Sequence, residues 1–294
     1  MWKWILTLAA VTGGGLLARS SYERKTLAVD RYEIKTDKIV RDRIFVFLSD
    51  LHDNCFGEGQ RDLLDAIARE KPDAVLIGGD MMVVKKRADI DAALFFVNKL
   101  AKQYPVFYGN GNHENRMNQK RGVYGDQYDR LVKALKDMGV HHLSDAFAAI
   151  DEEIAVYGLN LEQRYYKKFS HETMETDYIE RRIGKGDKKR YRILLAHSPL
   201  YHEAYARWGA DLTLCGHFHG GTIRIPGLGG LMTPQLQLFK KCCGGLLWNH
   251  GKAMIVSRGL GTHSINIRLN NKPELVVVRL KSRNYLQKPG HLLY

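Results

Sequence analysis

The chain has 294 residues, with 45 lysine and arginine residues against 32 aspartate and glutamate residues, and a net charge of +13. This length allows a sizeable core, and the charge favours anionic partners, such as phosphoesters, acidic lipid headgroups, anionic polymers or nucleic acid, without choosing among them. The four cysteines have no Cys-x-x-Cys spacing, which argues against a zinc knuckle or a disulfide framework.

The chain begins with an uncharged segment, Trp4–Ala18, that has basic residues on both sides. At 15 residues it is shorter than the ~20 residues of a typical transmembrane helix, and it matches the upper end of a signal-peptide core. We therefore expect residues 1–25 to form an uncleaved signal anchor or transmembrane segment. A buried core helix is the alternative.

Short apolar runs then alternate with amphipathic patterns. The runs break into glycine or polar residues, which is typical of strands, and cover Arg43–Leu48, Ala74–Ile77 and Val106–Tyr108. Apolar residues at helical spacing predict helices at Arg61–Arg69, Ile90–Lys102 and Gln127–Met138. Because strands and helices alternate, we expect parallel strands in one sheet that is covered by helices.

The later part of the chain has a different pattern. Apolar runs at Ile193–Leu195 and Leu212–Leu214 resemble the earlier strands. Further short strands, separated by glycine and proline turns, are predicted at Ile154–Leu159, Thr222–Ile225, Met254–Ser257 and Glu274–Leu280. They imply a second, mixed or antiparallel sheet. We therefore expect an α/β two-sheet sandwich flanked by helices: a single domain at 43–281, after a linker and first strand region at 26–42 and before a tail at 282–294.

Polar side chains with metal-ligand chemistry stand where the apolar runs end. They are Asp50, His52, Asp80, Asn112, His113, His197, His217 and His219. Because strand ends are where α/β folds gather their functional groups, we expect these side chains to converge. Carboxylate, amide and imidazole donors without a thiolate suit manganese, iron, zinc or cobalt. The set predicts a site for two divalent metal ions, with manganese as the first choice.

These residues lie in five short motifs: Ser-Asp-Leu-His, Gly-Gly-Asp, Gly-Asn-His-Glu, Ala-His-Ser-Pro and Gly-His-Phe-His-Gly-Gly. Their order from Asp50 to His219 resembles the calcineurin-like metallophosphoesterases. The two glycines after His219 and the tail from Met254 to Leu280 are similar to a membrane-associated or exported bacterial phosphodiesterase branch, which includes UDP-2,3-diacylglucosamine diphosphatase-like enzymes. The resemblance covers roughly Arg43 to Leu280 and also implies the sandwich fold.

The resemblance implies a role for each ligand. Asp80 would bridge the two metal ions. Asp50, His52 and His219 would complete one metal sphere, and Asn112, His197 and His217 the other. His113 would protonate the leaving group or stabilise charge on the phosphoryl oxygens. The implied activity is a two-metal phosphohydrolase that cleaves a phosphodiester, phosphomonoester or pyrophosphate bond with a hydroxide held between the ions.

Substrate contacts are sought in the basic segment Gln163–Arg192, in which Tyr165 and Tyr166 are interleaved. We expect Arg164 and Lys167 to grip an anionic substrate there, although a solvated helix and turn is an equally good interpretation. His263, in a Gly-Leu-Gly-Thr-His turn, is a further candidate, because the family places this turn near the site.

The expected location is a bacterial cell membrane, with the catalytic domain extracytoplasmic. Expected partners are a phosphate-ester substrate and an anionic membrane or cell-envelope surface, while nucleic acid is not expected and the oligomeric state is left open. Two other functions stay open at this point. The positive charge permits a nuclease, and a degenerate family member could act as a non-catalytic envelope-binding scaffold, although no ligand is missing.

Overall fold

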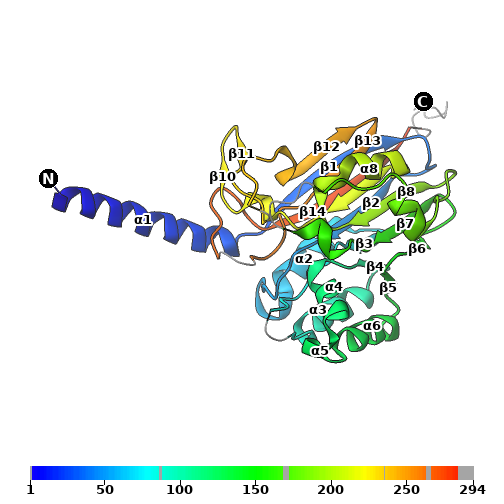
Figure 1. Ribbon diagram of the computed structural model, residues 1–294, viewed down its shortest axis with the longest axis horizontal. Coiled ribbons are helices and arrows are strands. Elements are labelled where there is room, and N and C mark those ends of the chain that lie inside the picture. Colours follow the sequence, from blue (N-terminus) through cyan, green and yellow to red (C-terminus); the bar gives the residue numbers. More distant parts are fainter. Residues whose placement is uncertain (1, 86–87, 168–171, 235, 263–265, 284–294) are drawn as a thin grey trace, which may run out of the picture.

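The computed structural model describes residues 2–85, 88–167, 172–234, 236–262 and 266–283. Two six-stranded sheets form its body, and the long helix α1 (Trp2–Lys25) projects from one end (Figure 1). The fold is the α/β two-sheet sandwich flanked by helices that the sequence predicts.

The first sheet holds the strands that precede Asp50, Asp80 and Asn112. Its strands, in spatial order, are β1 (Ala28–Thr36), β14 (Glu274–Ser282), β2 (Arg43–Leu48), β3 (Ala74–Ile77), β4 (Val106–Gly109) and β5 (His141–Leu143). Strands β2 to β5 are parallel, and β14 runs antiparallel to β2. The associated helices are α2 (Arg61–Glu70), α3 (Asp91–Ala101), α4 (Asn112–Gln119), α5 (Arg121–Tyr124) and α6 (Gln127–Asp137).

The second sheet holds the strands that precede His197 and His217. Its order is β12 (Gly245–Asn249), β13 (Lys252–Val256), β9 (Leu212–Cys215), β8 (Tyr191–Ala196), β7 (Ile154–Leu159) and β6 (Ala146–Ala149). The four central strands are parallel, and both edge strands are antiparallel to their neighbours. Helices α7 (Tyr178–Ile183) and α8 (His202–Trp208) pack on this sheet, and a small separate hairpin joins β10 (Arg224–Ile225) and β11 (Gly229–Gly230).

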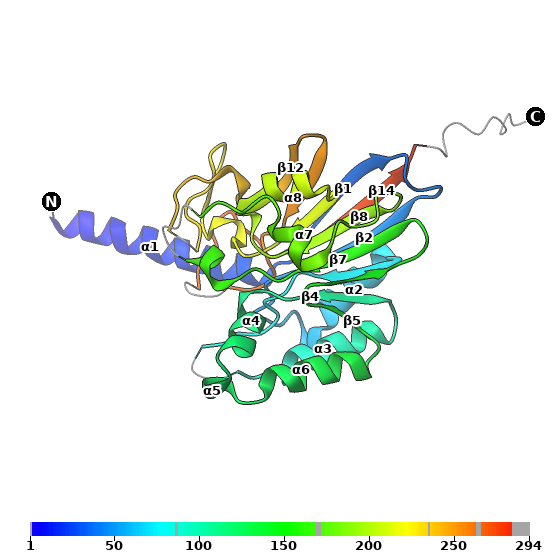
Figure 2. The same ribbon diagram turned by 45° about the vertical axis from the view of Figure 1, so that its right-hand side comes forward.

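The alternation of side chains along β2 shows how the layers form. Phe45 and Phe47 point into a core between the two sheets, where they meet residues such as Leu195 of β8. Val46 and Leu48 point to the opposite face, against α2, α3 and α6. A third core lies between the second sheet and helices α7 and α8. The result is four layers, with helices outside both sheets (Figure 2).

Two predicted strands lie outside the second sheet. The run Thr222–Ile225 contains β10 of the separate hairpin. Glu274–Leu280, which was expected in the second sheet, belongs to β14 and lies between β1 and β2 of the first. Its residues are buried on both faces, with Val276 in the core between the sheets and Val277 in the core under the helices. A strand buried on both faces has the same apolar pattern in either sheet, so the sequence pattern does not determine which one it joins.

The predicted membrane location is wrong. Helix α1 has 24 residues, but the three consecutive glycines Gly13–Gly15, together with Lys3 and Thr7, dilute its apolar residues. Within the described ranges, no helix combines the length and the apolarity that crossing a bilayer requires. This finding contradicts the predicted anchoring of the protein in a membrane through its N-terminal segment.

The last turn of α1 is instead part of the folded body. Ser20 and Glu23 are 2% and 4% exposed. The hydroxyl oxygen of Ser20 accepts a hydrogen bond from the backbone N–H of Arg268 at 3.0 Å, and the Glu23 carboxylate accepts one from the N–H of Asn271 at 2.9 Å. The helix end therefore holds the segment that runs from Arg268 to Asn271.

Replacing Glu23 by alanine should lower the free energy of unfolding by about 1–3 kcal/mol, because the buried N–H of Asn271 loses its acceptor. The measurement is urea unfolding, with Glu33→Ala as the matched control. Glu33 lies on an exposed position of β1, where a substitution changes stability by no more than ~0.5 kcal/mol. Equal stability of the two variants would show that α1 does not support the domain.

Candidate active site

Eight side chains predicted from the strand ends meet where the two sheets come together. Asp50, Asp80 and Asn112 follow β2, β3 and β4 of the first sheet, and His197 and His217 follow β8 and β9 of the second. Their ligand atoms form three groups, each with all atoms within 4.8 Å of one another: Asp50, His52 and His219; His52, Asp80 and His113; and Asp80, His197 and His217. Residues from both sheets therefore build one centre.

The first group surrounds one oxygen of Asp50. Nε2 of His219 lies 3.5 Å from Asp50 Oδ1, and Nε2 of His52 lies 3.8 Å from the same atom. The two Nε2 atoms are 3.3 Å apart. The other two groups share Asp80, whose Oδ2 lies 3.2 Å from Nε2 of His197 and 3.8 Å from Nε2 of His52. Asp80 therefore lies between a first cluster, Asp50, His52 and His219, and a second cluster, Asn112, His197 and His217.

The side chain of Asn112 tests whether metal ions fit here. One arm of its amide lies 2.9 Å from His217 Nδ1 and 3.2 Å from Asp80 Oδ2. A nitrogen in that arm would donate hydrogen bonds to both atoms, whereas an oxygen would add a third acceptor and would suit a bound cation. Nε2 of His217 is also buried without a hydrogen-bond partner among the described residues. The donor set fits two divalent cations.

Backbone carbonyls fix the orientation of two ligand imidazoles. Nδ1–H of His197 donates to the carbonyl oxygen of Gly78 at 2.8 Å, and Nδ1–H of His219 donates to that of Gly261 at 3.1 Å. When the ring is neutral, this tautomer leaves Nε2 with a lone pair for a cation. Asp50 is held in turn by the hydroxyl of Ser49 at 2.6 Å and by the N–H of His217.

The electrostatics favour positive charge at the centre. Burial lowers the pKa of His197, but the carboxylates of Asp80 and Asp50 outweigh burial and raise it to about 10. For His217, burial and the neighbouring His197 hold the pKa well below its ordinary value, so this ring stays neutral. Two buried carboxylates thus attract a cation, while neutral imidazole remains available to ligate it.

Glycines let the turns approach one another closely. Gly79 has a φ of +88°, and a Cβ there would lie 1.9 Å from the backbone nitrogen of Gly111. A Cβ on Gly261 would lie 2.1 Å from the carbonyl oxygen of Leu51. The turns that carry Asp80 and Asn112 could not pack this tightly with a side chain at Gly79.

Several ligands themselves have left-handed backbone. The φ angles are 54° for Asp50, 47° for His52, 55° for Asp80, 70° for His217 and 48° for His219. Such conformations cost on the order of 1–3 kcal/mol each and persist where the surrounding structure enforces them. The fold therefore places strain at the ligands.

Glu114 is a functional residue that the sequence analysis missed. Its fully buried carboxylate accepts hydrogen bonds from the N–H groups of Asp80 (2.9 Å), Met81 (3.2 Å) and Gly111 (3.0 Å) and from the hydroxyl of Tyr108 (2.7 Å). It joins the turn after β3 to the turn after β4 and so sets the position of Asp80. Its place directly after Asn112-His113 was the available signal.

Arg268 and Asn271 support the centre from the C-terminal part of the chain. The buried guanidinium of Arg268 donates to the carbonyl oxygens of Gly259 at 3.1 Å and Gly261 at 2.6 Å. The Asn271 amide donates to the carbonyl oxygen of His219 at 2.7 Å. Since α1 holds this same segment, its last turn is linked to His219 through two hydrogen bonds. No sequence periodicity marks these residues.

His113 presents one nitrogen to the centre. Its Nδ1 accepts a hydrogen bond from the backbone N–H of Val84 at 2.6 Å. The proton of the neutral ring is therefore on Nε2, which lies 4.0 Å from Asp80 Oδ2. Burial lowers the pKa of His113, and a second proton on Nδ1 would oppose the N–H of Val84. The ring is set up as a neutral hydrogen-bond donor.

The residues expected to contact substrate do not have the surroundings that the sequence predicts. Arg164 lies 3.0 Å from Glu162 and 3.7 Å from Glu175 and stacks on the ring of Tyr165. Other basic side chains of Gln163–Arg192 are also paired, as Arg182 is with Asp145. Lys167 is exposed. His263 lies outside the described residues. The region therefore has far less uncompensated positive charge than its composition indicates.

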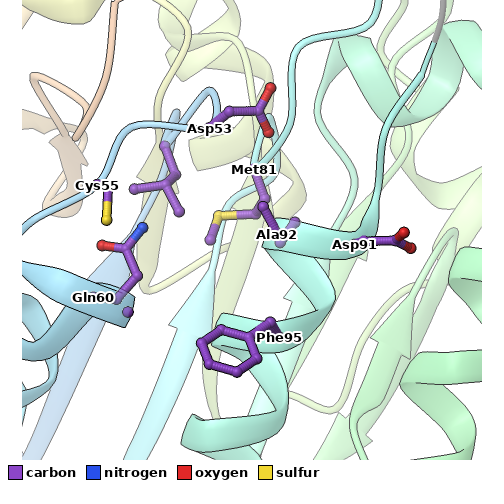
Figure 3. Close-up of a pocket in the computed structure, with 10 residues that line it drawn as sticks. Asp53, Cys55, Gln60, Met81, Asp91, Ala92 and Phe95 are labelled. Atoms are coloured by element: carbon purple, nitrogen blue, oxygen red, sulfur yellow. The ribbon is translucent and has the colours of Figure 1, made fainter.

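A neighbouring cavity of about 250 Å³ lies beside the ligand loops, between the loop after β2 and helix α3 (Figure 3). Leu51, Met81 and Phe95 line it, with the carboxylates of Asp53 and Asp91 also present. Leu51 and Met81 belong to the core under the helices, whereas their chain neighbours Asp50 and Asp80 belong to the metal centre. None of the residues that line this cavity is a predicted metal ligand.

The two-sheet α/β fold, with carboxylates and imidazoles clustered at its strand ends, defines a metal-dependent hydrolase. The chain belongs to the calcineurin-like phosphoesterase family, because the sequence model of that family matches residues 44–221, more than half of the chain. It is therefore a metal-dependent phosphoester hydrolase.

Similar proteins include two bacterial relatives that align over most of the chain. Phosphodiesterase YaeI of Escherichia coli (strain K12) is 27% identical over 241 residues, which cover 80% of this chain and 81% of that protein. An uncharacterized metallophosphoesterase of Aquifex aeolicus (strain VF5) is 27% identical over 270 residues, which cover 90% and 96%. Among solved structures, TT1561 of Thermus thermophilus aligns with a TM-score of 0.47 at 14% identity, over 74% of this chain and 90% of that chain.

Replacing Glu114 by glutamine should lower the free energy of unfolding by about 1.5–3 kcal/mol, because an amide nitrogen would face backbone N–H donors that now bind a carboxylate. Metal affinity should fall as well, since the turn that holds Asp80 loosens. Urea unfolding and metal analysis after dialysis provide the measurements. Glu180→Gln, on an exposed helix position, is the control and should match the unmodified protein in both. Full metal content and unchanged stability in Glu114→Gln would contradict this role.

Proposed function

We propose that the protein hydrolyses a phosphodiester with two divalent metal ions bound at the strand-end centre. The observation that carries this proposal is that the two clusters meet at Asp80, which faces ligands of both. Two carboxylates against two divalent cations leave net positive charge, which suits an anionic phosphoryl group. The similarity to phosphodiesterase YaeI supports a diester over a monoester or a pyrophosphate.

Different side chains would hold the two metal ions. Asp50, His52 and His219 would hold one ion and Asn112, His197 and His217 the other, with Asp80 shared between them. When bound, a pair of such ions activates water and clamps the phosphoryl oxygens for in-line displacement. Oxygen and nitrogen donors without a thiolate suit manganese, iron, zinc or cobalt, and manganese is the first ion to test.

His113 would act on the leaving group. Because Val84 holds Nδ1, the proton on Nε2 is the one directed at the centre. Donating a hydrogen bond to the departing oxygen lowers the cost of its negative charge. This role differs from that of a histidine cation, which would require protons on both ring nitrogens.

A nuclease is the less favoured alternative. Nucleic-acid affinity depends on several unpaired cationic side chains that reach phosphates, and the arginines of Gln163–Arg192 instead pair with acids of the same chain. A non-catalytic scaffold is disfavoured because every ligand predicted from the motifs converges.

Purified protein supplied with manganese separates these functions. The substrates are an aryl phosphodiester, an aryl phosphomonoester, a nucleotide-sugar diphosphate and single-stranded DNA. The proposal requires the largest kcat/KM for the aryl phosphodiester and loss of activity with a chelator. Preference for the monoester or the diphosphate would reassign the substrate class, and no hydrolysis of any phosphoester would refute the function.

Asp80→Asn should reduce occupancy of both metal ions and lower turnover by several orders of magnitude, because both clusters depend on this carboxylate. Metal content per protein and turnover are the measurements. The control is Asp53→Asn, which alters an exposed carboxylate on the neighbouring loop and should keep both properties. Two full equivalents of metal with normal turnover in Asp80→Asn would exclude the shared role.

His113→Asn should keep both metal ions and slow hydrolysis by ~10²–10³, the usual cost of removing one preorganised hydrogen-bond donor. The loss should be smaller for nitrophenolate than for an alkoxide, since a good leaving group needs less help. Rates measured across a series of aryl and alkyl diesters decide the point. Equal losses across the series would move His113 from the leaving group to the phosphoryl oxygens.

A further inference from the structure

The ring of Tyr166 forms one wall of the metal centre. Tyr166 ends a short 3-10 turn, Gln163–Tyr166, in the segment that follows β7. Its ring lies edge-on to His217, with centroids 5.1 Å apart, and 6.2 Å from the ring of His197. It therefore stands beside the two imidazoles of the second cluster.

The hydroxyl of Tyr166 is buried, yet it has no hydrogen-bond partner in the part of the chain that the structure describes. The tyrosines packed nearby differ in this respect. Tyr205 donates to the carbonyl oxygen of Ser198 at 2.8 Å, and Tyr201 donates to that of Tyr165 at 3.0 Å. A buried hydroxyl without a partner disfavours the folded state, and beside the ligands a substrate oxygen would supply the missing partner.

The hydroxyl of Tyr166 is a donor for an oxygen that enters the centre. Burial, and after it the carboxylate of Asp80, raise the pKa of Tyr166, which puts this hydroxyl within electrostatic reach of the centre. A phenol ordinarily keeps its proton up to about pH 10. Asp80 itself is already engaged, with Oδ1 accepting the N–H of His113 at 2.8 Å and Oδ2 facing His197. The proton of the phenol thus remains available to a group that enters the centre.

We propose that Tyr166 is a further catalytic residue, whose hydroxyl donates a hydrogen bond to a non-bridging oxygen of the substrate phosphoryl group on the His197 and His217 side. This inference rests on the proposed phosphoester hydrolysis. A fixed neutral donor stabilises charge that develops on a phosphoryl oxygen without itself transferring a proton. Tyr166 and His113 then act on different oxygens, the non-bridging oxygen and the leaving-group oxygen.

Tyr166→Phe tests the contact, because it removes the hydroxyl and keeps the ring against His217. The matched control is Tyr191→Phe. Tyr191 is also buried, and within the described ranges its hydroxyl is also without a hydrogen-bond partner. It lies at the start of β8, six residues before His197, which at ~3.3 Å per residue is about 20 Å from the centre.

Tyr166→Phe should lower kcat/KM for aryl and alkyl phosphodiesters by about 10–100-fold, equally for good and poor leaving groups, as expected for one hydrogen bond to a charged oxygen. The Kd of inorganic phosphate for the manganese-loaded protein, measured by calorimetry, should rise about 10-fold. Both metal equivalents should remain, and the melting temperature should equal or exceed that of the unmodified protein. Tyr191→Phe should also keep both metal equivalents and an unchanged or higher melting temperature, but it should retain the kcat/KM and the phosphate affinity of the unmodified protein.

Wild-type kcat/KM together with wild-type phosphate affinity in Tyr166→Phe would overturn the proposal. Loss of a metal equivalent would make the hydroxyl a ligand or a packing group, and a loss that grows for poor leaving groups would place it on the leaving oxygen; either result rejects the assignment. If the unmodified protein hydrolyses no phosphoester, the proposed function fails, whereas the phosphate affinities of the two phenylalanine variants still decide whether Tyr166 contacts a phosphoryl oxygen.

Discussion

The structure depends on two buried carboxylates, Asp50 and Asp80, held side by side at the junction of the sheets. A pair of buried negative charges is unstable unless positive charge compensates it. The imidazole of His197, whose pKa the two carboxylates raise, meets part of this requirement, and divalent cations would meet the rest. Gly79 and Glu114 hold the turn of Asp80 against the turn of Asn112, so that the ligands gather in one cluster.

Much of this arrangement is predictable from the sequence, because strand ends are marked by an abrupt change from apolar to polar residues. The limits of β2, β3 and β7 coincide with the predicted runs, and helices α2, α3 and α6 follow the predicted spacing. The ligands converge because parallel strands end at one edge. The motifs, rather than composition, identify the chemistry.

What escaped prediction depends on contacts between distant parts of the chain. The apolar pattern of β14 fits either sheet, and its pairing with β1 is set by tertiary packing. Neither the four hydrogen bonds of Glu114 nor the hydroxyl of Tyr166, which has no partner among the described residues, can be read from the periodicity of the sequence. The uncompensated positive charge of the basic segment is smaller than its composition predicts, because composition does not show which acidic residues pair with the basic ones. The uncharged run in α1 is less apolar than its lack of charge indicates, because glycines occupy its middle.

The ligands come from both sheets, and this origin has a thermodynamic consequence. Asp50 and His219 are far apart in sequence, so an ion held between them closes a long loop of chain in the manner of a removable cross-link. Any ligand that binds the native state alone shifts the folding equilibrium by mass action. The lifetime of the folded protein therefore depends on the concentration of free metal. When that metal is scarce, more of the chain is unfolded and is degraded by proteases.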